Sequence, residues 1–415
     1  MIAEEILSKA VKSSLKKALS LKPFNKAAFP APVQNKKYML YIHIPFCDGL
    51  CPYCSFHRFN FEENIAREYF KSLNKEIRLL KIIGFDFESM YFGGGTPTIL
   101  MDELINTIDN ARYLFNIKEI SCETNPNHLE KSYLEQLSSR IDRLSVGVQS
   151  FNNDLLKQLQ RYGRYGSGEY ILERIQDAVS VFPSLNVDMI FNLPNQDESI
   201  LLDDINKIIL SGTNQTTFYP LMTSPSVDRL IRSNIGKIDF SREKYYYNLI
   251  LENLGSVFTP TTAWTFNRNS TGMIDEYIVD YDEYIGAGSG SFSYINGTLF
   301  VNHFSLQKYM EELQKDTLPI DRMHKFNSRE KMRYTFMKEI FNLKLDKNRF
   351  KENYNVPINI GLFDVMLFMN IFNAFHKTNQ SFFGVNRRGM YFAVLMMREF
   401  FSGVNIIRDQ ARKFQ

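Results

Sequence analysis

Three cysteines stand close together near the start of the chain: Cys47, Cys51 and Cys54. They lie in the segment YIHIPFCDGLCPYCSF (residues 41–56), with the spacing C-x3-C-x2-C. Three thiolates on one loop can bind three irons of a cubane cluster and leave the fourth iron open. An open iron can chelate an amino and a carboxylate group, and an electron passed through it can break a sulfonium C–S bond. The spacing therefore predicts a 4Fe–4S cluster with an open ligand position.

A structural zinc site is the alternative for the same residues. His57 follows Cys54 by three positions, so a Cys3His tetrahedron also fits the spacing. The position of the loop favours the cluster, because it follows the first strand of a β/α series, and such folds place their active sites after strand ends. The remaining cysteine, Cys122, lies in a strand segment, where we expect a buried thiol and not a ligand.

An alternation of short apolar strands and amphipathic helices must position these residues. Strands are predicted at residues 38–44, 90–92, 119–123, 144–148, 186–191 and 216–221. Helices are predicted at residues 64–83, 101–115, 129–137, 154–160, 168–181 and 198–210. Strands that alternate with helices form parallel sheets with both faces covered. The predicted fold class is therefore α/β, a partial (β/α)6 barrel over residues 37–225.

Other segments flank the predicted barrel. Residues 1–36 are predicted to form an amphipathic helix, packed on the main body, and a proline-containing linker. Residues 226–305 are an extension of the barrel, with a helix at 241–254 and a glycine- and serine-rich stretch, IGAGSGSF, expected to be a loop. Helical patterns dominate residues 306–415, which we expect to form a helical C-terminal domain.

Composition and charge argue against several classes of function. Among 415 residues, 49 are basic and 46 acidic, a balance that gives no reason to expect a nucleic-acid partner. Four cysteines are no disulfide framework in a chain of this length, and the first twenty residues contain no continuous apolar stretch typical of a secretory signal. The apolar stretches at residues 365–375 and 390–397 are too short to span a membrane. We therefore expect a cytoplasmic protein without a membrane span.

Five motifs in order resemble one branch of the radical S-adenosylmethionine (SAM) superfamily. They are YIHIPFC-x3-C-x2-C, GGGTPT at residues 93–98, ETNP at 123–126, GVQSF at 147–151 and DMIFNLP at 188–194. The branch contains the oxygen-independent coproporphyrinogen III oxidases, haem chaperones and anaerobic haem-degrading methyltransferases. The resemblance covers residues 38–194 and implies a radical SAM barrel. It also implies a 4Fe–4S cluster on the three cysteines and SAM as cofactors, with a 5′-deoxyadenosyl radical released when SAM is cleaved.

The resemblance also gives single residues expected roles. The glycine run would let the backbone approach the SAM amino group, and Arg161 or the nearby Arg164 would pair with the SAM carboxylate. Asp188 would hold the ribose hydroxyls. Tyr41 resembles a tyrosine on the cluster side of the site, and we expect it to be catalytic. The full set of expected SAM contacts is Gly93, Gly94, Gly95, Thr96, Glu123, Gln149, Arg161, Asp188, Tyr53 and Phe56.

The family further implies partners. A tetrapyrrole, either a porphyrinogen or haem, would be the substrate or cargo, and an electron donor such as flavodoxin or ferredoxin would reduce the cluster. His303 could face the tetrapyrrole, but a lone histidine is more often structural, and we expect no ligand role for it. The glycine-rich residues 275–297 resemble the strand and turn that follow the barrel in this family.

One position departs from the oxidases, which carry a further cysteine two residues after the third, where this chain has Phe56. The departure favours the chaperone-like or haem-modifying relatives. Three interpretations remain: a coproporphyrinogen dehydrogenase-like radical SAM enzyme that decarboxylates, or methylates and opens, a tetrapyrrole; a haem-binding chaperone; and a zinc-stabilised barrel without radical chemistry. Recognition of propionates would need Arg or Lys near the barrel mouth, and the sequence alone does not place them there.

Overall fold

Six parallel strands form the centre of the molecule and lie side by side in chain order. The computed structural model describes residues 2–24, 26, 28–34, 36–268, 281–376 and 381–412. Nearly every residue of the six strands is buried, which explains their continuous apolar sequences. The strands are β2 (Met39–Ile44), β5 (Ser89–Gly94), β6 (Glu119–Thr124), β7 (Arg143–Gln149), β8 (Ser184–Phe191) and β9 (Gln215–Pro220). The partial barrel predicted from the sequence is thus confirmed.

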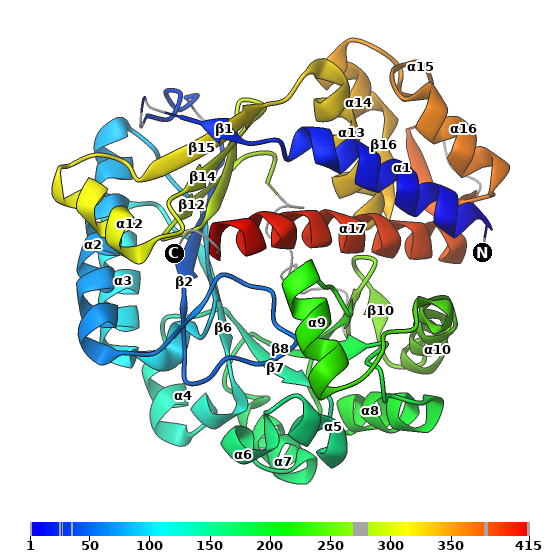
Figure 1. The fold of residues 1–415 in the computed structure, drawn as a ribbon, viewed down its shortest axis with the longest axis horizontal. Coiled ribbons are helices and arrows are strands. Elements are labelled where there is room, and N and C mark those ends of the chain that lie inside the picture. The colour runs from blue at the N-terminus through cyan, green and yellow to red at the C-terminus, as the bar shows by residue number, and fades with distance from the viewer. Residues whose placement is uncertain are drawn as a thin grey trace.

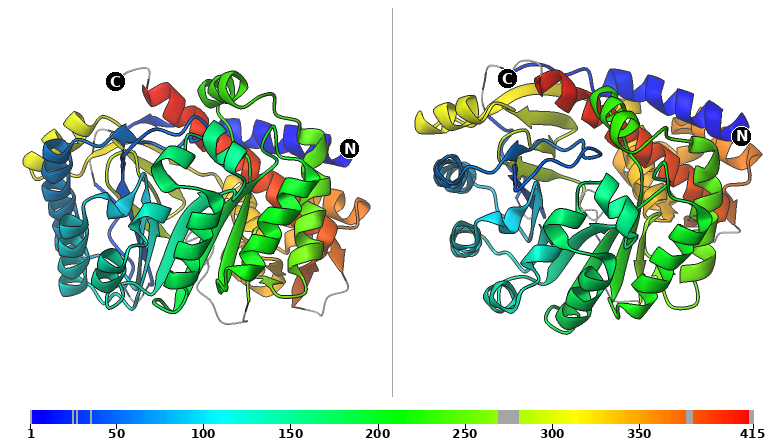
Figure 2. Two further views of the ribbon diagram at one scale, coloured as in Figure 1. Left: turned by 90° about the horizontal axis from the view of Figure 1, so that it is seen from below. Right: turned by 60° about the horizontal axis from the view of Figure 1, so that its bottom comes forward.

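Helices that connect the strands cover the outside of the sheet, as Figures 1 and 2 show. The alternation follows the prediction closely, and α8 has the predicted bounds. The connecting helices are α2 (Glu63–Ile83), η1 (Pro97–Ile99), α3 (Met101–Leu114), η2 (Pro126–His128), α4 (Lys131–Leu137), α5 (Asn153–Gln158), α6 (Tyr162–Tyr165), α7 (Gly168–Ala178) and α8 (Glu198–Leu210).

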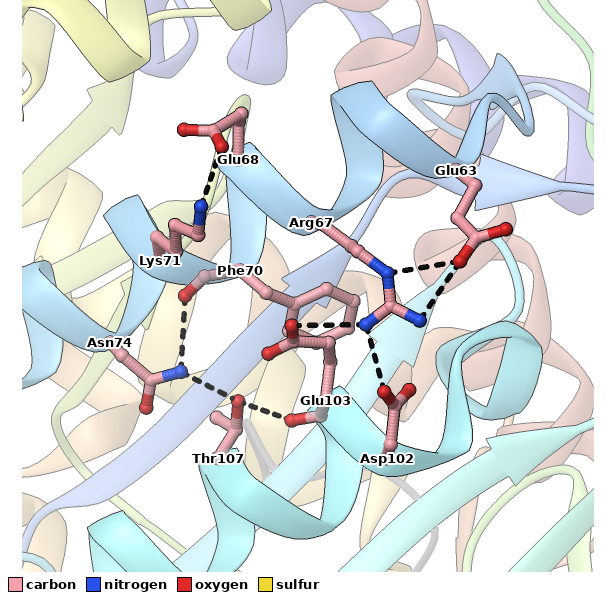
Figure 3. Close-up of polar contacts among 9 residues, drawn as sticks. All are labelled: Glu63, Arg67, Glu68, Phe70, Lys71, Asn74, Asp102, Glu103 and Thr107. Atoms are coloured by element: carbon pink, nitrogen blue, oxygen red, sulfur yellow. Dashed lines mark hydrogen bonds and ion pairs between the residues drawn. The ribbon is translucent and has the colours of Figure 1, made fainter.

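Polar contacts join the neighbouring helices α2 and α3 (Figure 3). Arg67 on α2 donates hydrogen bonds to Asp102 at 2.8 Å and to Glu103 at 3.3 Å. Deeper in the same interface, the buried Asn74 side chain donates to Thr107 Oγ1 at 3.0 Å. The exposed ion pairs contribute little to stability, whereas the buried amide needs its partner. These contacts fix the register of the two helices that flank the first strands.

The sheet continues beyond the barrel at both edges. β12 (Tyr284–Ala287) pairs in parallel with β2, and antiparallel strands extend from it. These are β13 (Phe292–Ile295), β14 (Thr298–Asn302), β15 (Ile320–Lys325) and β1 (Lys22–Pro23). The opposite edge carries β11 (Thr265–Asn267) and β10 (Thr259–Pro260). The sheet is therefore mixed and open, and not a closed barrel.

The prediction of a loop at IGAGSGSF is wrong in part. Residues 288–291 form a turn, but the first three residues end β12 and Phe292 begins β13, in line with the resemblance of residues 275–297 to a strand and turn. Gly286 lies opposite Tyr41, and a Cβ at this glycine would stand 2.3 Å from the carbonyl oxygen of Phe292. The small residues permit a close strand pair and do not mark an unstructured segment. Residues 275–280 of the glycine-rich segment lie outside the described residues.

The C-terminal region is mainly helical, as expected, although β15 within it belongs to the main sheet. Its helices are α12 (Leu306–Gln314), α13 (Ser328–Phe341), α14 (Lys347–Tyr354), α15 (Ile358–Gly361), α16 (Phe363–Ile371) and α17 (Arg387–Arg412). A small sheet is formed by β16 (Lys344–Asp346), β17 (Phe375–His376) and β18 (Phe382–Val385). Between barrel and C-terminal region lie β11, β10 and the helices α9 (Pro225–Asn234), η3 (Phe240–Arg242) and α10 (Glu243–Leu254).

The first and last helices lie side by side across the barrel (Figure 1). The N-terminal helix, α1 (Ile2–Ala18), packs along α17, which confirms that it packs on the main body. Arg398 on α17 donates to both carboxylate oxygens of Glu243 at 2.6 Å, and Glu399 accepts from Ser8 Oγ at 2.7 Å. Among the described residues, α17 alone is long and apolar enough to cross a membrane, and 67% of its apolar stretch is buried inside the molecule. A core helix has this burial.

Candidate functional site

A cavity of about 280 Å³ opens at the carboxyl ends of the parallel strands. Loops and strand ends form one wall, and the last turns of α17 form the other. Parallel α/β folds bind their ligands at this end of the sheet. The predicted site residues that line the cavity are Tyr41, Cys47, Cys51, Tyr53, Cys54, Phe56, Gly94, Gly95, Thr96, Glu123, Gln149, Arg161 and Asp188. Gly93 is the one predicted site residue outside this lining set.

The cysteine loop is closed at its base by two short parallel strands, β3 (Phe46–Cys47) and β4 (Phe59–Asn60). Arg58 holds the loop from inside, because its Nη2 atom donates to the carbonyl oxygens of Cys51 at 2.6 Å and Cys54 at 2.8 Å. The fold therefore turns three cysteines of one short segment toward one cavity.

Positive charge surrounds the thiol of Cys51. Arg164 Nη2 lies 2.9 Å from Cys51 Sγ, and Arg161 Nη1 lies 3.8 Å from it. Burial alone would raise the pKa of Cys51, but the two arginines and Arg58 hold that pKa below its ordinary value. Burial raises the pKa of Cys47 to about 12. The arginines thus stabilise the thiolate of Cys51, whereas Cys47 needs a bound cation to ionise.

His57 points away from the three cysteines. Its Nε2 atom lies 3.1 Å from Ser289 Oγ, and its ring stacks on His43 with centroids 5.8 Å apart. The side chain is buried beside the β12–β13 turn and is not among the residues that line the cavity. Within the described ranges, no three Cys, His, Asp or Glu side chains already surround one point as ligands of a single metal ion. The contacts of His57 therefore argue against the Cys3His zinc interpretation.

Cys122 lies in the core, as predicted. It sits on β6, is fully buried, and its Sγ contacts the carbonyl oxygen of Glu123 at 3.4 Å. It does not line the cavity.

The glycine run packs tightly against the cysteine loop. A Cβ at Gly95 would stand 2.5 Å from the carbonyl oxygen of Phe46, and one at Gly94 would stand 2.7 Å from the His43 ring. Gly94 also has φ +118°, which side chains disfavour. Its N–H donates to Glu123 Oε2 at 3.1 Å. The glycines are needed for the approach of β5 to the loop, a reason that the motif alone did not give.

Polar side chains of three neighbouring strands line the cavity: Glu123 near the end of β6, Gln149 at the end of β7 and Asp188 within β8. Glu123 on β6 accepts from Tyr91 OH at 2.9 Å. On β8, Asp188 accepts from Ser145 Oγ at 2.8 Å and from Asn186 Nδ2 at 2.7 Å. Gln149 ends β7 at a bulge, where its φ of 77° turns the backbone out of the sheet.

Arg161 is buried and retains hydrogen-bonding capacity. Its guanidinium contacts the thiol of Cys51, the hydroxyl of Tyr53 (3.2 Å), the amide of Asn125 (3.2 Å) and the carbonyl of Gly147, none of which is a carboxylate. Its Nε is buried without a hydrogen-bond partner in the described part of the chain. An unpaired buried guanidinium nitrogen fits a ligand carboxylate. Arg164, the alternative candidate, also lines the cavity.

Tyr41 and His43 form a hydrogen-bonded pair on β2. His43 Nε2 lies 2.9 Å from the carbonyl oxygen of His57, which can only accept, so Nε2 carries the proton. Burial lowers the pKa of His43 to about 4, which keeps the ring neutral. His43 Nδ1 therefore accepts from Tyr41 OH at 2.9 Å. Burial also raises the pKa of Tyr41, which stays a phenol.

The remaining predicted residues occupy the rim or lie elsewhere. Thr96 Oγ1 accepts from Asn125 Nδ2 at 2.8 Å, and Phe56 is 43% exposed at the mouth. His303 does not line the cavity, and its Nδ1 lies 3.6 Å from Asp321 Oδ1. The absence of a ligand role for His303 stays a prediction.

Residues of α17 were missed by sequence reasoning. Phe400, Phe401, Val404, Asn405 and Arg408 line the cavity opposite the strands. They lie more than 170 residues beyond β9, so no local pattern connects them to the barrel. The amphipathic spacing of these residues in a helix was the available signal.

The sequence matches the model of the radical SAM superfamily over residues 41–208. The chain contains a radical SAM domain. Members of this superfamily use a 4Fe–4S cluster and SAM. Such a pair of cofactors is bound by thiolates, a guanidinium group and carboxylates. This cavity offers the three cysteines, Arg161, whose Nε has no partner among the described residues, and the carboxylates of Glu123 and Asp188.

The relatives of this chain carry two different names. The haem chaperone HemW of Bacillus subtilis is 26% identical over 346 residues, covering 79% of this chain and 89% of the relative. An oxygen-independent coproporphyrinogen III oxidase of Helicobacter pylori is 26% identical over 353 residues, covering 76% of this chain and 75% of the relative. The solved structure of coproporphyrinogen III oxidase (HemN) from Escherichia coli superposes with a TM-score of 0.74 at 19% identity, covering 94% and 93% of the two chains. The chain therefore has the HemN-like fold and HemN/HemW relatives.

Proposed function

We propose that this chain is a cytoplasmic radical SAM protein that binds a tetrapyrrole in the cavity between the strand ends and α17. The observation that carries the proposal is the meeting in one cavity of Cys47, Cys51 and Cys54 with Arg161, whose buried Nε lacks a partner among the described residues. One thiolate for each of three irons leaves a fourth iron for SAM, whereas a single zinc would need another protein ligand.

The cavity residues divide between the two cofactors. The three cysteines would hold the cluster, and Arg161 would hold the SAM carboxylate. Glu123, Gln149 and Asp188 would bind the amino and ribose groups, with Gly94, Gly95, Thr96, Tyr53 and Phe56 around them and Gly93 behind. When reduced, by a donor such as flavodoxin or ferredoxin, the bound cluster supplies the electron that cleaves SAM.

Tyr41 is held in a fixed orientation in the cavity. Its phenol lines the cavity and donates to the neutral His43 ring, so its oxygen can accept a hydrogen bond from a ligand. The apolar residues Phe400, Phe401 and Val404 of α17 exclude water from the same space.

The tetrapyrrole class is inferred from the relatives, which are named haem chaperones and coproporphyrinogen III oxidases. Phe56 stands where the oxidases have a further cysteine, and its ring lies at the mouth of the cavity beneath Arg408. This substitution favours a haem-binding chaperone or a haem-modifying methyltransferase as the second candidate.

We propose that the chain has four units: the N-terminal segment 1–36, the barrel 37–225, the extension 226–305 and the C-terminal segment 306–415.

An anaerobic incubation tests the proposal. Reconstituted protein receives SAM and reductant, with coproporphyrinogen III in one tube and haem in another, and products are read by mass spectrometry. Loss of carbon dioxide from coproporphyrinogen supports an oxidase, and methylated or opened haem supports a methyltransferase. Haem bound in unchanged form supports the chaperone. Absence of binding to both compounds would contradict the tetrapyrrole proposal.

A further inference from the structure

Arginines gather between the cysteine loop and the end of α17. Arg58 belongs to the cysteine loop, and Arg408 and Arg412 belong to the last turns of α17. Arg58 and Arg408 line the cavity. Arg412 donates to the carbonyl oxygens of Ser55 and Phe56, so it ties the helix end to the loop. Two segments more than 300 residues apart therefore bring their positive charges to one rim.

Arg58 has donors that the protein does not use. Its Nη2 is engaged by the carbonyl groups of the cysteine loop, at 2.6 and 2.8 Å. Its Nε and Nη1 atoms are buried and have no hydrogen-bond partner among the residues that the structure describes. A buried guanidinium with unsatisfied donors is costly, and an anionic ligand removes that cost.

The end of α17 brings further cationic side chains close to Arg58. Arg408 is buried, with 9% of its surface exposed, and its guanidinium carbon lies 5.1 Å from the Phe56 ring centroid. It donates a hydrogen bond to Asn405 Oδ1 at 2.9 Å. Asp409 is the acidic neighbour on α17, and it is bonded to Arg412 at 3.2 Å and to Ser226. Burial and the charge of Arg58 lower the pKa of Arg412.

The carboxylates inside the cavity are fewer than its arginines, because Glu123 and Asp188 line it together with Arg58, Arg161, Arg164 and Arg408. Glu123 accepts from Tyr91 and Gly94, and Asp188 accepts from side chains of its own and the neighbouring strand. An incoming carboxylate would therefore meet a rim with more arginine than acid.

We propose that Arg58 and Arg408 bind carboxylate groups of the ligand in this cavity. This inference rests on the proposed function, under which those carboxylates are the propionate side chains of the tetrapyrrole. Guanidinium groups in a partly desolvated rim bind carboxylates strongly. The neighbouring Phe400, Phe401 and Val404 offer an apolar surface to the macrocycle. Propionate recognition is thus placed where α17 meets the cysteine loop.

Haem and its dimethyl ester provide the test, because they differ only in the two carboxylates. Each is titrated into the full-length, cluster-loaded protein, and binding is followed by difference absorbance. Wild-type protein is expected to bind haem tighter than the ester by about tenfold to a hundredfold. Arg408→Gln should weaken haem binding by about tenfold and leave the ester unchanged. Arg387→Gln, at the other end of α17 in an exposed pair with Glu252, should change neither affinity.

Other results would overturn the inference. Equal affinity of the wild type for haem and ester, or an equal loss of both in Arg408→Gln, would remove the carboxylate site and leave the tetrapyrrole proposal standing. Failure of the wild type to bind either compound would remove the proposed function itself. Arg58→Gln is a second variant, with iron content measured beside affinity, because Arg58 also holds the cysteine loop. Loss of haem selectivity with iron content retained is the expected result.

Discussion

At the scale of single residues, the three cysteines share a cavity but have different surroundings. Cys51 faces two arginines, and Cys47 is buried with a raised pKa. In the proposed cluster each thiolate would hold one iron, so none could replace another. The spacing was sufficient to predict this part of the site, because all three residues lie in one segment whose bend is local.

Each of the single variants Cys47→Ala, Cys51→Ala and Cys54→Ala should abolish cluster assembly. The expected result is loss of bound iron and sulfide. The brown colour that an iron–sulfur cluster gives the protein should be lost with them. Cys122→Ser is the matched control, because this thiol is fully buried in β6 outside the cavity. Wild-type iron in all three variants, or a loss of iron in the control, would contradict the assignment.

The sequence predicted Glu123, Gln149 and Asp188 but not Arg58 or Arg408. The first three were implied by the family resemblance, and neighbouring parallel strands bring them to one cavity. Arg408 reaches the cavity only because α17 returns across the barrel. Such a return depends on tertiary packing, which a local pattern does not encode.

At the scale of elements, the six strands agree with their predicted ranges to within two residues at each end. Their apolar runs are local signals. The pairing of β12 with β2 was missed because the two strands lie more than 240 residues apart and β12 runs into a turn rich in glycine and serine. Register with a distant strand, and not intrinsic propensity, makes that segment a strand.

The glycine run gives a prediction for β5. Gly94→Val should destabilise the fold by about 1–3 kcal/mol, because a side chain would collide with His43 and Ile44 in a backbone with positive φ. SAM affinity should fall together with stability, because the collision displaces the Tyr41–His43 pair. Thermal unfolding and calorimetric SAM titration measure the two effects. Gly163→Ala, with no atom within 4 Å of its Cβ position in α6, should keep SAM affinity and should not lower stability, because alanine favours helix. Unaltered stability in Gly94→Val would contradict the packing role.

Asp204 on α8 gives a prediction for pH dependence. Its carboxylate accepts from Phe151 N at 2.7 Å and Ser150 Oγ at 2.9 Å, which ties α8 to the loop after β7. Burial raises its pKa from 3.8 to about 7, although these hydrogen bonds oppose the rise. As pH rises, Asp204 ionises in the unfolded chain before it ionises in the folded one. Its contribution to the free energy of unfolding is therefore complete below about pH 4 and falls by up to roughly 4 kcal/mol by pH 7.

Urea unfolding at pH 5 and pH 8 measures that loss. Asp204→Asn should shrink the difference between the two pH values, because the titrating group is gone. Glu198→Gln, an exposed residue of α8 whose charge is not among those that shift the Asp204 pKa, should leave the difference as in the wild type. An unchanged pH dependence in Asp204→Asn would contradict the raised pKa.

At the scale of the whole molecule, a buried charge cluster holds α17 over the cavity. Arg398 bonds to Glu243, which is fully buried, and to Glu399 at 2.7 Å. Arg398→Ala would leave the Glu243 carboxylate buried without its cation, which should cost about 3–5 kcal/mol. Arg387→Ala breaks only an exposed pair and should cost about 1 kcal/mol or less.

Chemical unfolding and limited proteolysis of α17 distinguish the two variants. Faster cleavage within α17 in Arg398→Ala alone is expected, because the helix is released from α10. Equal stability of the two variants would contradict the view that this cluster closes the site.

The most direct test of the three-cysteine, SAM-binding site is an electron paramagnetic resonance spectrum of the reconstituted, reduced protein before and after addition of SAM. We predict a 4Fe–4S signal whose g values change when SAM occupies the open iron. A cluster signal that SAM leaves unchanged, or a protein that binds one zinc and yields no such signal, would contradict the account.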